Sequence, residues 1–145
     1  MPTVSRFFIK TGLIWFVLAL LTALVAELQW LSIPALLPVY WHMLMVGWIT
    51  QIIIGVSLWM FPGRSRSDAF RDHLKGWLIF IMLNAGLALR FISEPLAGAG
   101  AAPVWNGMLA ASALLQWIAG GIYILELWPR VQSKKQRLKK RKERS

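Results

Sequence analysis

The sequence contains no cysteine, which excludes several classes of site at once. Without thiols the chain cannot form disulfides, hold an iron–sulfur cluster, build a zinc–thiolate site or attach a c-type haem covalently. Charged residues are scarce, at 15% of 145 residues, and only six residues are acidic. We find no Walker loop, no dinucleotide-binding glycine fingerprint, no Ser-His-Asp set and no carboxylate pair at a plausible position. Any metal or haem must therefore be held non-covalently.

Hydrophobic residues, by contrast, make up 57% of the chain, and nine residues are tryptophan. They form four apolar segments, at about 11–31, 40–61, 76–92 and 104–128. At about 1.5 Å per residue, segments of roughly this length cross a bilayer as helices. The first one resembles a signal peptide, but its apolar part is longer than a signal core, so we expect a retained helix. The sequence predicts an all-α membrane protein, a four-transmembrane-helix bundle over residues 1–131 followed by a polybasic tail at 132–145.

The positive charges predict how the bundle is oriented. Most of them lie before the first span, in the loop GRSRSDAFRDHLKG and in the tail, which holds eight of the sixteen lysines and arginines. Short basic loops stay in the cytoplasm, so we expect an N-in/C-in protein of the inner (plasma) membrane. This rule accounts for the net charge of +10 without nucleic acid as a partner. The tail is expected to contact anionic lipid.

His42 is the one histidine within an apolar segment, near the start of the run Tyr40–Pro62. A titratable ring in a membrane helix needs a partner, so it is a candidate functional residue. Imidazole is a common ligand of haem iron and other transition metals. Alternatively, His42 bonds to lipid headgroups or to a backbone carbonyl at the interface, beside the belt aromatics Tyr40 and Trp41. His73 falls in the basic loop on the opposite side, too far away to ligate the same iron.

An ideal helix through the second span has two distinct faces. Small and polar residues on one face would let another helix approach closely, with the glutamine hydrogen-bonding across the contact: Gly47, Gln51 and Gly55. The other face carries His42 with apolar residues that suit either a flat ligand such as a porphyrin or ordinary packing: Val46, Ile49, Ile53 and Met60.

Arg90 lies near the outer end of the third span. It either snorkels to lipid phosphates or binds a carboxylate such as a haem propionate, which its fork of donors suits. The second role requires Arg90 and His42 to be on the same side of the membrane, as the topology predicts. The next segment, 93–103, is rich in glycine, alanine and proline, and we expect it to form a loop in which Glu94 is the only charge.

The segment from His42 through Gly47-Trp48-Ile49-Thr50-Gln51, Ile53 and Gly55-Val56 to Met60-Phe61-Pro62 resembles a helix of the haem-copper oxidase subunit I superfamily. It is most similar to small stand-alone relatives of the C-type oxidase subunit and to NnrS-type haem and copper proteins. The resemblance covers about a sixth of the chain. Full oxidases have about three times as many spans, and their further histidine ligands have no counterpart here. The resemblance therefore does not imply oxygen or nitric oxide reduction by this chain alone.

The resemblance implies that His42 is an axial ligand of a haem b. The pocket would be formed by His42, Arg90, Met45 and Ile49. One histidine per chain leaves the second axial position to another subunit, to Met43 or Met45, or empty. A two-fold homodimer with two His42 rings on one haem is the simplest arrangement, with Arg90 from each chain facing the propionates.

Three functions remain open at this point. The first is a membrane b-type cytochrome for electron transfer, haem storage or gas sensing. The second is a cofactor-free structural subunit of a larger respiratory or photosynthetic complex, which the small size and the tryptophan anchors favour. A transporter or channel module is disfavoured because the acidic residues near the spans lie at their ends.

Overall fold

The computed structural model describes residues 1–28, 33–61, 69–100 and 102–131, and its regular structure there is entirely helical. The side chains of residues 69–73, including His73, lie outside the description. The helices are α1 (Thr3–Glu27), α2 (Leu36–His42), the π-helix η1 (Met43–Thr50), α3 (Gln51–Met60), α4 (Ala69–Gly98) and α5 (Val104–Leu127). Because α2, η1 and α3 follow one another without a break, they form one continuous rod.

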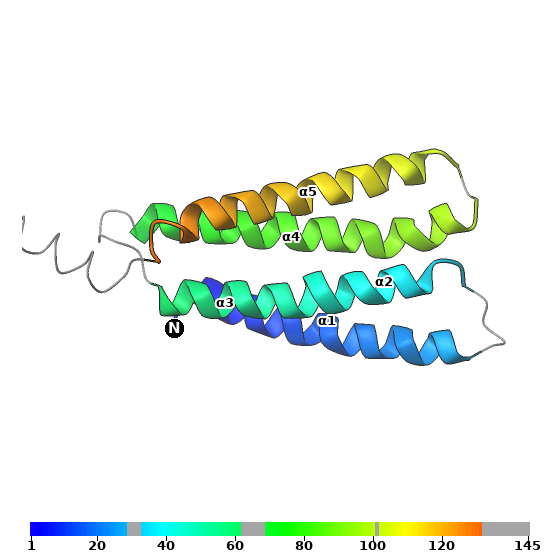
Figure 1. Cartoon of the computed structure of the whole chain (residues 1–145), viewed down its shortest axis with the longest axis horizontal. Coiled ribbons are helices and arrows are strands. Elements are labelled where there is room, and N and C mark those ends of the chain that lie inside the picture. The colour runs from blue at the N-terminus through cyan, green and yellow to red at the C-terminus, as the bar shows by residue number, and fades with distance from the viewer. Residues whose placement is uncertain (29–32, 62–68, 101, 132–145) are drawn as a thin grey trace, which may run out of the picture.

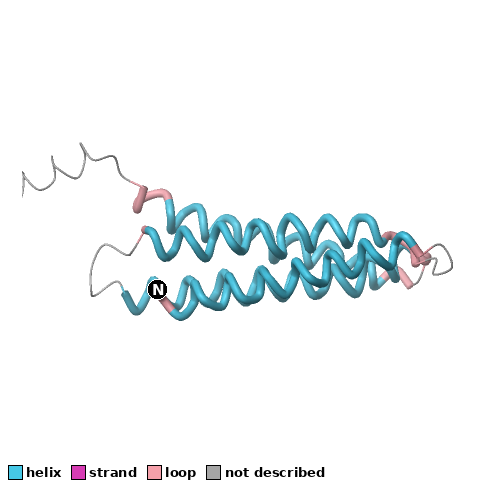
Figure 2. The backbone as a smooth tube through the Cα atoms, turned by 90° about the horizontal axis from the view of Figure 1, so that it is seen from below, coloured by secondary structure: helices cyan, strands magenta, loops and turns pink. Residues whose placement is uncertain are grey.

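The rods form an elongated four-helix bundle made of two hairpins (Figures 1 and 2). Helix α1 packs along the α2–η1–α3 rod, and α4 packs along α5. The N-terminus, the end of α3, the start of α4 and the end of α5 lie at one end, which we call the N-terminal end. Four segments are long and apolar enough to cross a membrane: Thr3–Glu27, Leu36–Met60, Leu74–Gly98 and Val104–Leu127. The chain is a multi-pass membrane protein, and the predicted four-helix fold is confirmed.

Several helix bounds differ from the prediction. The second span begins at Leu36 rather than near residue 40, and α4 begins at Ala69, within the expected basic loop, rather than near residue 76.

Helix α1 begins at Thr3 rather than near residue 11, so Arg6 and Lys10 lie on the helix instead of preceding it. Long basic side chains allow this, because their stems can lie along apolar surface while the charge stays in water. The helix ends at Glu27, earlier than the predicted residue 31, because Leu28 is already extended.

The expected loop at 93–103 is also wrong in its first half, because α4 continues to Gly98 with Pro95 inside it. Proline removes one backbone hydrogen bond, which costs least near a helix end. The helix is closed by a bond from the Ala99 amide to the Pro95 carbonyl, 3.0 Å long. Gly100 then turns the chain with φ of 71°, a conformation that favours glycine. As a consequence, Glu94 stands on the helix one turn after Arg90.

The π-helical stretch η1 changes which side chains of the rod share a face. A π-turn closes i→i+5 bonds and holds more residues than an α-turn, so it rotates everything that follows. Ile53 and Met60 are accordingly 54% and 64% exposed. Val46 packs against the core, and Ile49 is 36% exposed. The prediction of one face shared by His42, Val46, Ile49, Ile53 and Met60 assumed an uninterrupted α-helix, and it stays a prediction.

The predicted close approach through small residues is confirmed. A Cβ on Gly47 would lie 2.8 Å from Cβ of Trp15 in α1, and one on Gly55 would lie 3.0 Å from Cβ of Phe8. Between these two glycines, Gln51 is fully buried and bonds to Asn84 of α4. The rod therefore packs tightly on α1 and is held to the second hairpin by a polar contact.

Candidate functional site

His42, the last residue of α2, has both ring nitrogens in hydrogen bonds. Nδ1 lies 2.8 Å from the carbonyl oxygen of Pro38, and Nε2 lies 3.0 Å from Nη1 of Arg90. A guanidinium group only donates, so Nε2 must be the acceptor and Nδ1 must carry the hydrogen that Pro38 accepts. The two partners together fix a neutral ring whose Nε2 lone pair points at α4. The side chain is 32% exposed, so the ring lies at the edge of the bundle.

Arg90 and Glu94 stand one turn apart on α4, facing His42. Glu94 Oε1 is 3.5 Å from Arg90 Nη1, and Glu94 Oε2 is 3.5 Å from His42 Nδ1. The arginine and glutamate side chains are only 16% and 12% exposed. Glu94 Oε2 is buried and accepts no hydrogen bond within the described part of the chain. The site thus holds a guanidinium and a carboxylate largely away from solvent, with the imidazole between them.

Helix α5 closes the site with Ser112 and Gln116. Ser112 is fully buried, and its hydroxyl donates to the Gly86 carbonyl at 2.6 Å. The same oxygen accepts from Gln116 Nε2 at 3.2 Å and from Arg90 Nε at 3.4 Å. Gly86 permits this contact, because a Cβ there would lie 2.9 Å from Cγ of Gln116. We call His42, Arg90, Glu94, Ser112 and Gln116 the His42 cluster.

The structure brings together two of the four residues predicted for a haem site. His42 and Arg90 are in contact across the two hairpins, as a site on one side of the membrane requires. Met45 and Ile49 lie on η1 and are 44% and 36% exposed. Met43, by contrast, is 1% exposed and packs in the cluster around Ala19 and Val39, where its sulfur is enclosed. Met43 is therefore unsuited to be a second axial ligand.

The sequence analysis did not assign Glu94, Ser112 and Gln116 to this site. The spacing of Arg90 and Glu94, four residues apart, is typical of a helical ion pair. A loop at 93–103 would take Glu94 off the helix, so the predicted loop conceals this pair. Ser112 and Gln116 stand one turn apart on α5, a spacing that puts them on one side of the helix, and a hydrogen bond joins them.

A metal ion and a haem require different sets of protein ligands. The described residues contain no group of three or more histidine, cysteine or acidic side chains that could hold a metal ion. A haem needs fewer protein ligands, and a single imidazole with its other nitrogen bonded to a carbonyl suits that role. Position 73 is on α4, seventeen residues before Arg90, or about 25 Å along the axis. Within one chain, His42 would be the one histidine in a position to hold a haem at this site.

A second polar network lies deeper in the bundle. Asn84 Oδ1 accepts from the Trp15 indole at 2.9 Å and from Gln51 Nε2 at 3.0 Å. Asn84 Nδ2 donates to the Phe80 carbonyl at 2.9 Å and to Gln51 Oε1 at 3.3 Å. Because these donors and acceptors satisfy one another, the network connects α1, α3 and α4 and leaves no group for a ligand.

Comparisons of the chain with family models, curated proteins and solved structures return no match. The functional argument therefore depends on the His42 cluster itself.

Proposed function

We propose that this protein holds a b-type haem within the membrane, with His42 as an axial ligand to the iron. The observation that supports this most is the tautomer of the His42 imidazole ring. Its Nδ1–H is bonded to the Pro38 carbonyl, so the basic electron pair is on Nε2, inside the bundle. Histidines that bind metals usually donate their other ring N–H to a carbonyl or carboxylate in this way. When bound, a haem of this type supplies reversible one-electron transfer.

Arg90 supports the proposal as a partner for the haem propionates. It donates to Nε2 in the structure, so it has to move before that nitrogen can bind iron. Its two other side-chain contacts, to Ser112 at 3.4 Å and to Glu94 at 3.5 Å, are at the long limit for hydrogen bonds. Both would have to be released for Arg90 to bind a propionate. A guanidinium fork then matches a carboxylate closely, which makes a propionate a suitable new partner.

The second axial ligand comes from a second copy of the chain in this proposal. His42 is the only histidine near the site, and Met43 is enclosed in the core. A two-fold homodimer brings equivalent residues together and gives one haem per two chains. Finding one haem per chain would reject the shared ligand while leaving His42 as the first ligand.

We also propose that both termini are cytoplasmic and that the host membrane is the inner (plasma) membrane. The support is the gathering of exposed basic residues at the N-terminal end, where Arg6, Lys10 and Lys75 lie. The loop and tail arginines and lysines, outside the described residues, follow the same ends of the spans in sequence. A basic end of a bundle faces the cytoplasm.

A cofactor-free role as a structural subunit of a larger membrane complex is the second candidate. One specific observation favours it: Nε2 of His42 already accepts a hydrogen bond from Arg90. Both ring nitrogens are therefore satisfied without iron. Under this alternative the protein is colourless, and His42 only stabilises the contact between the hairpins.

The test is the visible spectrum of the purified protein after expression with ample haem, with haem quantified as its pyridine complex. We expect a Soret band for the wild type, its loss in His42→Ala and its retention in His73→Ala. The second variant is a matched control, because it removes the chain's other imidazole. Circular dichroism shows whether both variants keep their helices. A colourless wild type would reject the haem proposal, and an undiminished band in His42→Ala would place the ligand elsewhere.

A further inference from the structure

Two basic residues of α1 lie on the side of the helix that faces away from the bundle. Arg6 and Lys10 are both exposed and stand four residues apart, so their side chains are neighbours on one face. Neither has a side-chain ion pair or hydrogen bond within the described residues. They lie in the first two turns of a membrane span, at the depth where lipid headgroups meet the hydrocarbon. Two positive charges without an anionic partner among the described residues favour binding of an anion at this depth.

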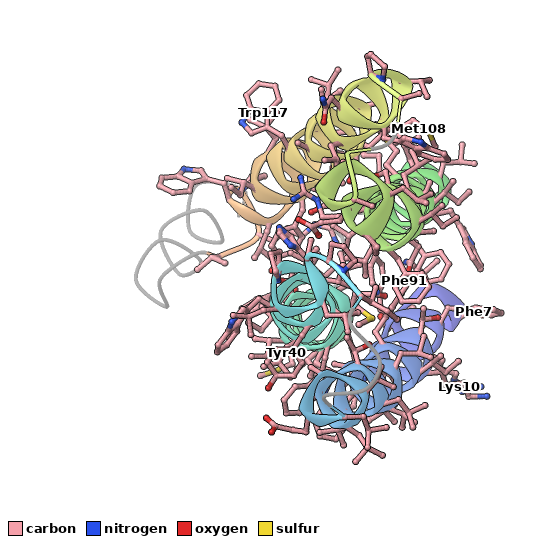
Figure 3. The ribbon with its side chains drawn as sticks, turned by 90° about the vertical axis from the view of Figure 1, so that its right-hand side faces the viewer. Phe7, Lys10, Tyr40, Phe91, Met108 and Trp117 are labelled. Carbon is pink, nitrogen blue, oxygen red and sulfur yellow. The ribbon has the colours of Figure 1, made fainter. Side chains whose placement is uncertain are left out.

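An aromatic group lies directly beside these charges. Phe7 of α1 is 46% exposed, and its ring centroid is 5.1 Å from that of Trp77 and 6.1 Å from that of Phe80. The Trp77 and Phe80 centroids are 5.7 Å apart. Phe7 and Lys10 project outward on the same side of α1 in Figure 3. Tryptophan is enriched at the membrane–water interface, so Trp77 supports an interfacial depth for the basic pair.

An apolar stripe continues from the basic pair toward the middle of the span. Its members are each more than half exposed and follow one another at helical spacing on α1: Leu13 (51%), Ile14 (59%), Val17 (55%) and Leu21 (51%). They occupy the same face as Lys10, since they stand three, four, seven and eleven residues after it. The face is therefore cationic at the interface and apolar below it. A phospholipid has the matching arrangement, with its charged headgroup at the interface and its apolar acyl chains below it.

We propose that this face of α1 is a binding site for an anionic phospholipid. Arg6 and Lys10 bind the headgroup phosphate, the aromatic group flanks the headgroup, and an acyl chain lies along the stripe from Leu13 to Leu21. Charge complementarity selects the occupant, because a neutral protein surface or a zwitterionic lipid leaves the two cations uncompensated. This site is separate from the haem proposal and from the lipid contact expected for the C-terminal tail.

The test uses the full chain in detergent, with retained lipids counted by native mass spectrometry. Wild type is compared with Arg6→Gln/Lys10→Gln and with Lys139→Gln/Lys140→Gln, which removes the same charge from the tail. Each is titrated with phosphatidylglycerol and with phosphatidylcholine. We expect wild type and the tail variant to retain phosphatidylglycerol in preference to phosphatidylcholine. The α1 variant should bind it about thirtyfold more weakly, since each of the two basic residues contributes about 1 kcal/mol near the surface.

Three outcomes would overturn the proposal. The first is equal retention of phosphatidylglycerol by the α1 variant and the wild type. The second is equal retention of both lipids by the wild type. In the third, the wild type retains neither lipid, which would indicate that another chain covers this face. Circular dichroism excludes unfolding of the α1 variant, and Arg6→Lys/Lys10→Arg, which keeps both charges, should restore binding.

Discussion

At the scale of single residues, the charged and polar side chains of the His42 cluster are one another's hydrogen-bond and ion-pair partners. Arg90 contacts His42, Glu94 and Ser112, so it connects all three elements of the cluster. Glu94 is 12% exposed and has Arg90 as its ion-pair partner on the same helix. Removing one member of such a pair costs more than removing both, because a lone buried charge has to be accommodated.

We therefore expect Arg90→Gln to lower the free energy of unfolding by about 2 kcal/mol or more. The double variant Arg90→Gln/Glu94→Gln should lose less than the sum of the two single variants. Denaturation by SDS in mixed micelles, followed by circular dichroism, measures the free energy of unfolding of the two single variants and the double variant. Strict additivity would show that the two side chains do not interact.

At the scale of helices, the glycines of the rod decide how closely the elements approach. Gly47 faces both α1 and α4, where an added Cβ would lie 2.8 Å from Trp15 Cβ and 2.9 Å from Leu87 Cδ2. Gly107 on α5 has no atom within 4 Å of the same position. The two glycines therefore differ in how closely other atoms surround them.

We expect Gly47→Ala to lower the free energy of unfolding by about 1–3 kcal/mol, because an extra methyl group overpacks the contact. Gly107→Ala is the matched control, and alanine there should leave stability unchanged or raise it by up to about 1 kcal/mol. The same denaturation in micelles measures both. A harmless Gly47→Ala would mean that α1 and the rod are not in close contact at this point.

The Asn84 network makes a second prediction at this scale. Replacing Asn84 by leucine removes the partners of Trp15 and Gln51 in the middle of the bundle. The expected loss is about 1–2 kcal/mol, the range of interhelical hydrogen bonds in membranes. Asn106→Leu, at an exposed asparagine of α5, should change stability by no more than about 0.5 kcal/mol. Equal effects of the two variants would contradict a structural role for the network.

At the scale of the whole molecule, the four-helix fold could be predicted because it follows from length and hydrophobicity. The Gly47–Gln51–Gly55 contact was also predictable, because these three residues follow one another at four-residue intervals along one helix face. The π-helix η1 was not predictable, since no residue type marks it. The position of Glu94 on α4 was not predictable either. Pro95 predicts a helix break, whereas α4 continues past it to Gly98.

The orientation of the whole bundle is testable because the chain lacks cysteine. We expect Ala102→Cys to react with a membrane-impermeant maleimide added to intact cells, since the turn between α4 and α5 would lie outside. Ser145→Cys should react only after the membrane is opened. Reversed labelling of the two variants would contradict the proposed N-in/C-in topology.

The central claim is that the His42 imidazole binds iron, and pulsed electron paramagnetic resonance tests this most directly. The oxidised, haem-loaded protein is prepared with ¹⁵N-labelled histidine, so that a directly bound imidazole nitrogen is identified by its hyperfine coupling to the iron. We expect a strong ¹⁵N coupling in the wild type and in His73→Ala, and none in His42→Ala. A haem-loaded wild type without ¹⁵N coupling, or a coupling that persists in His42→Ala, would contradict the account.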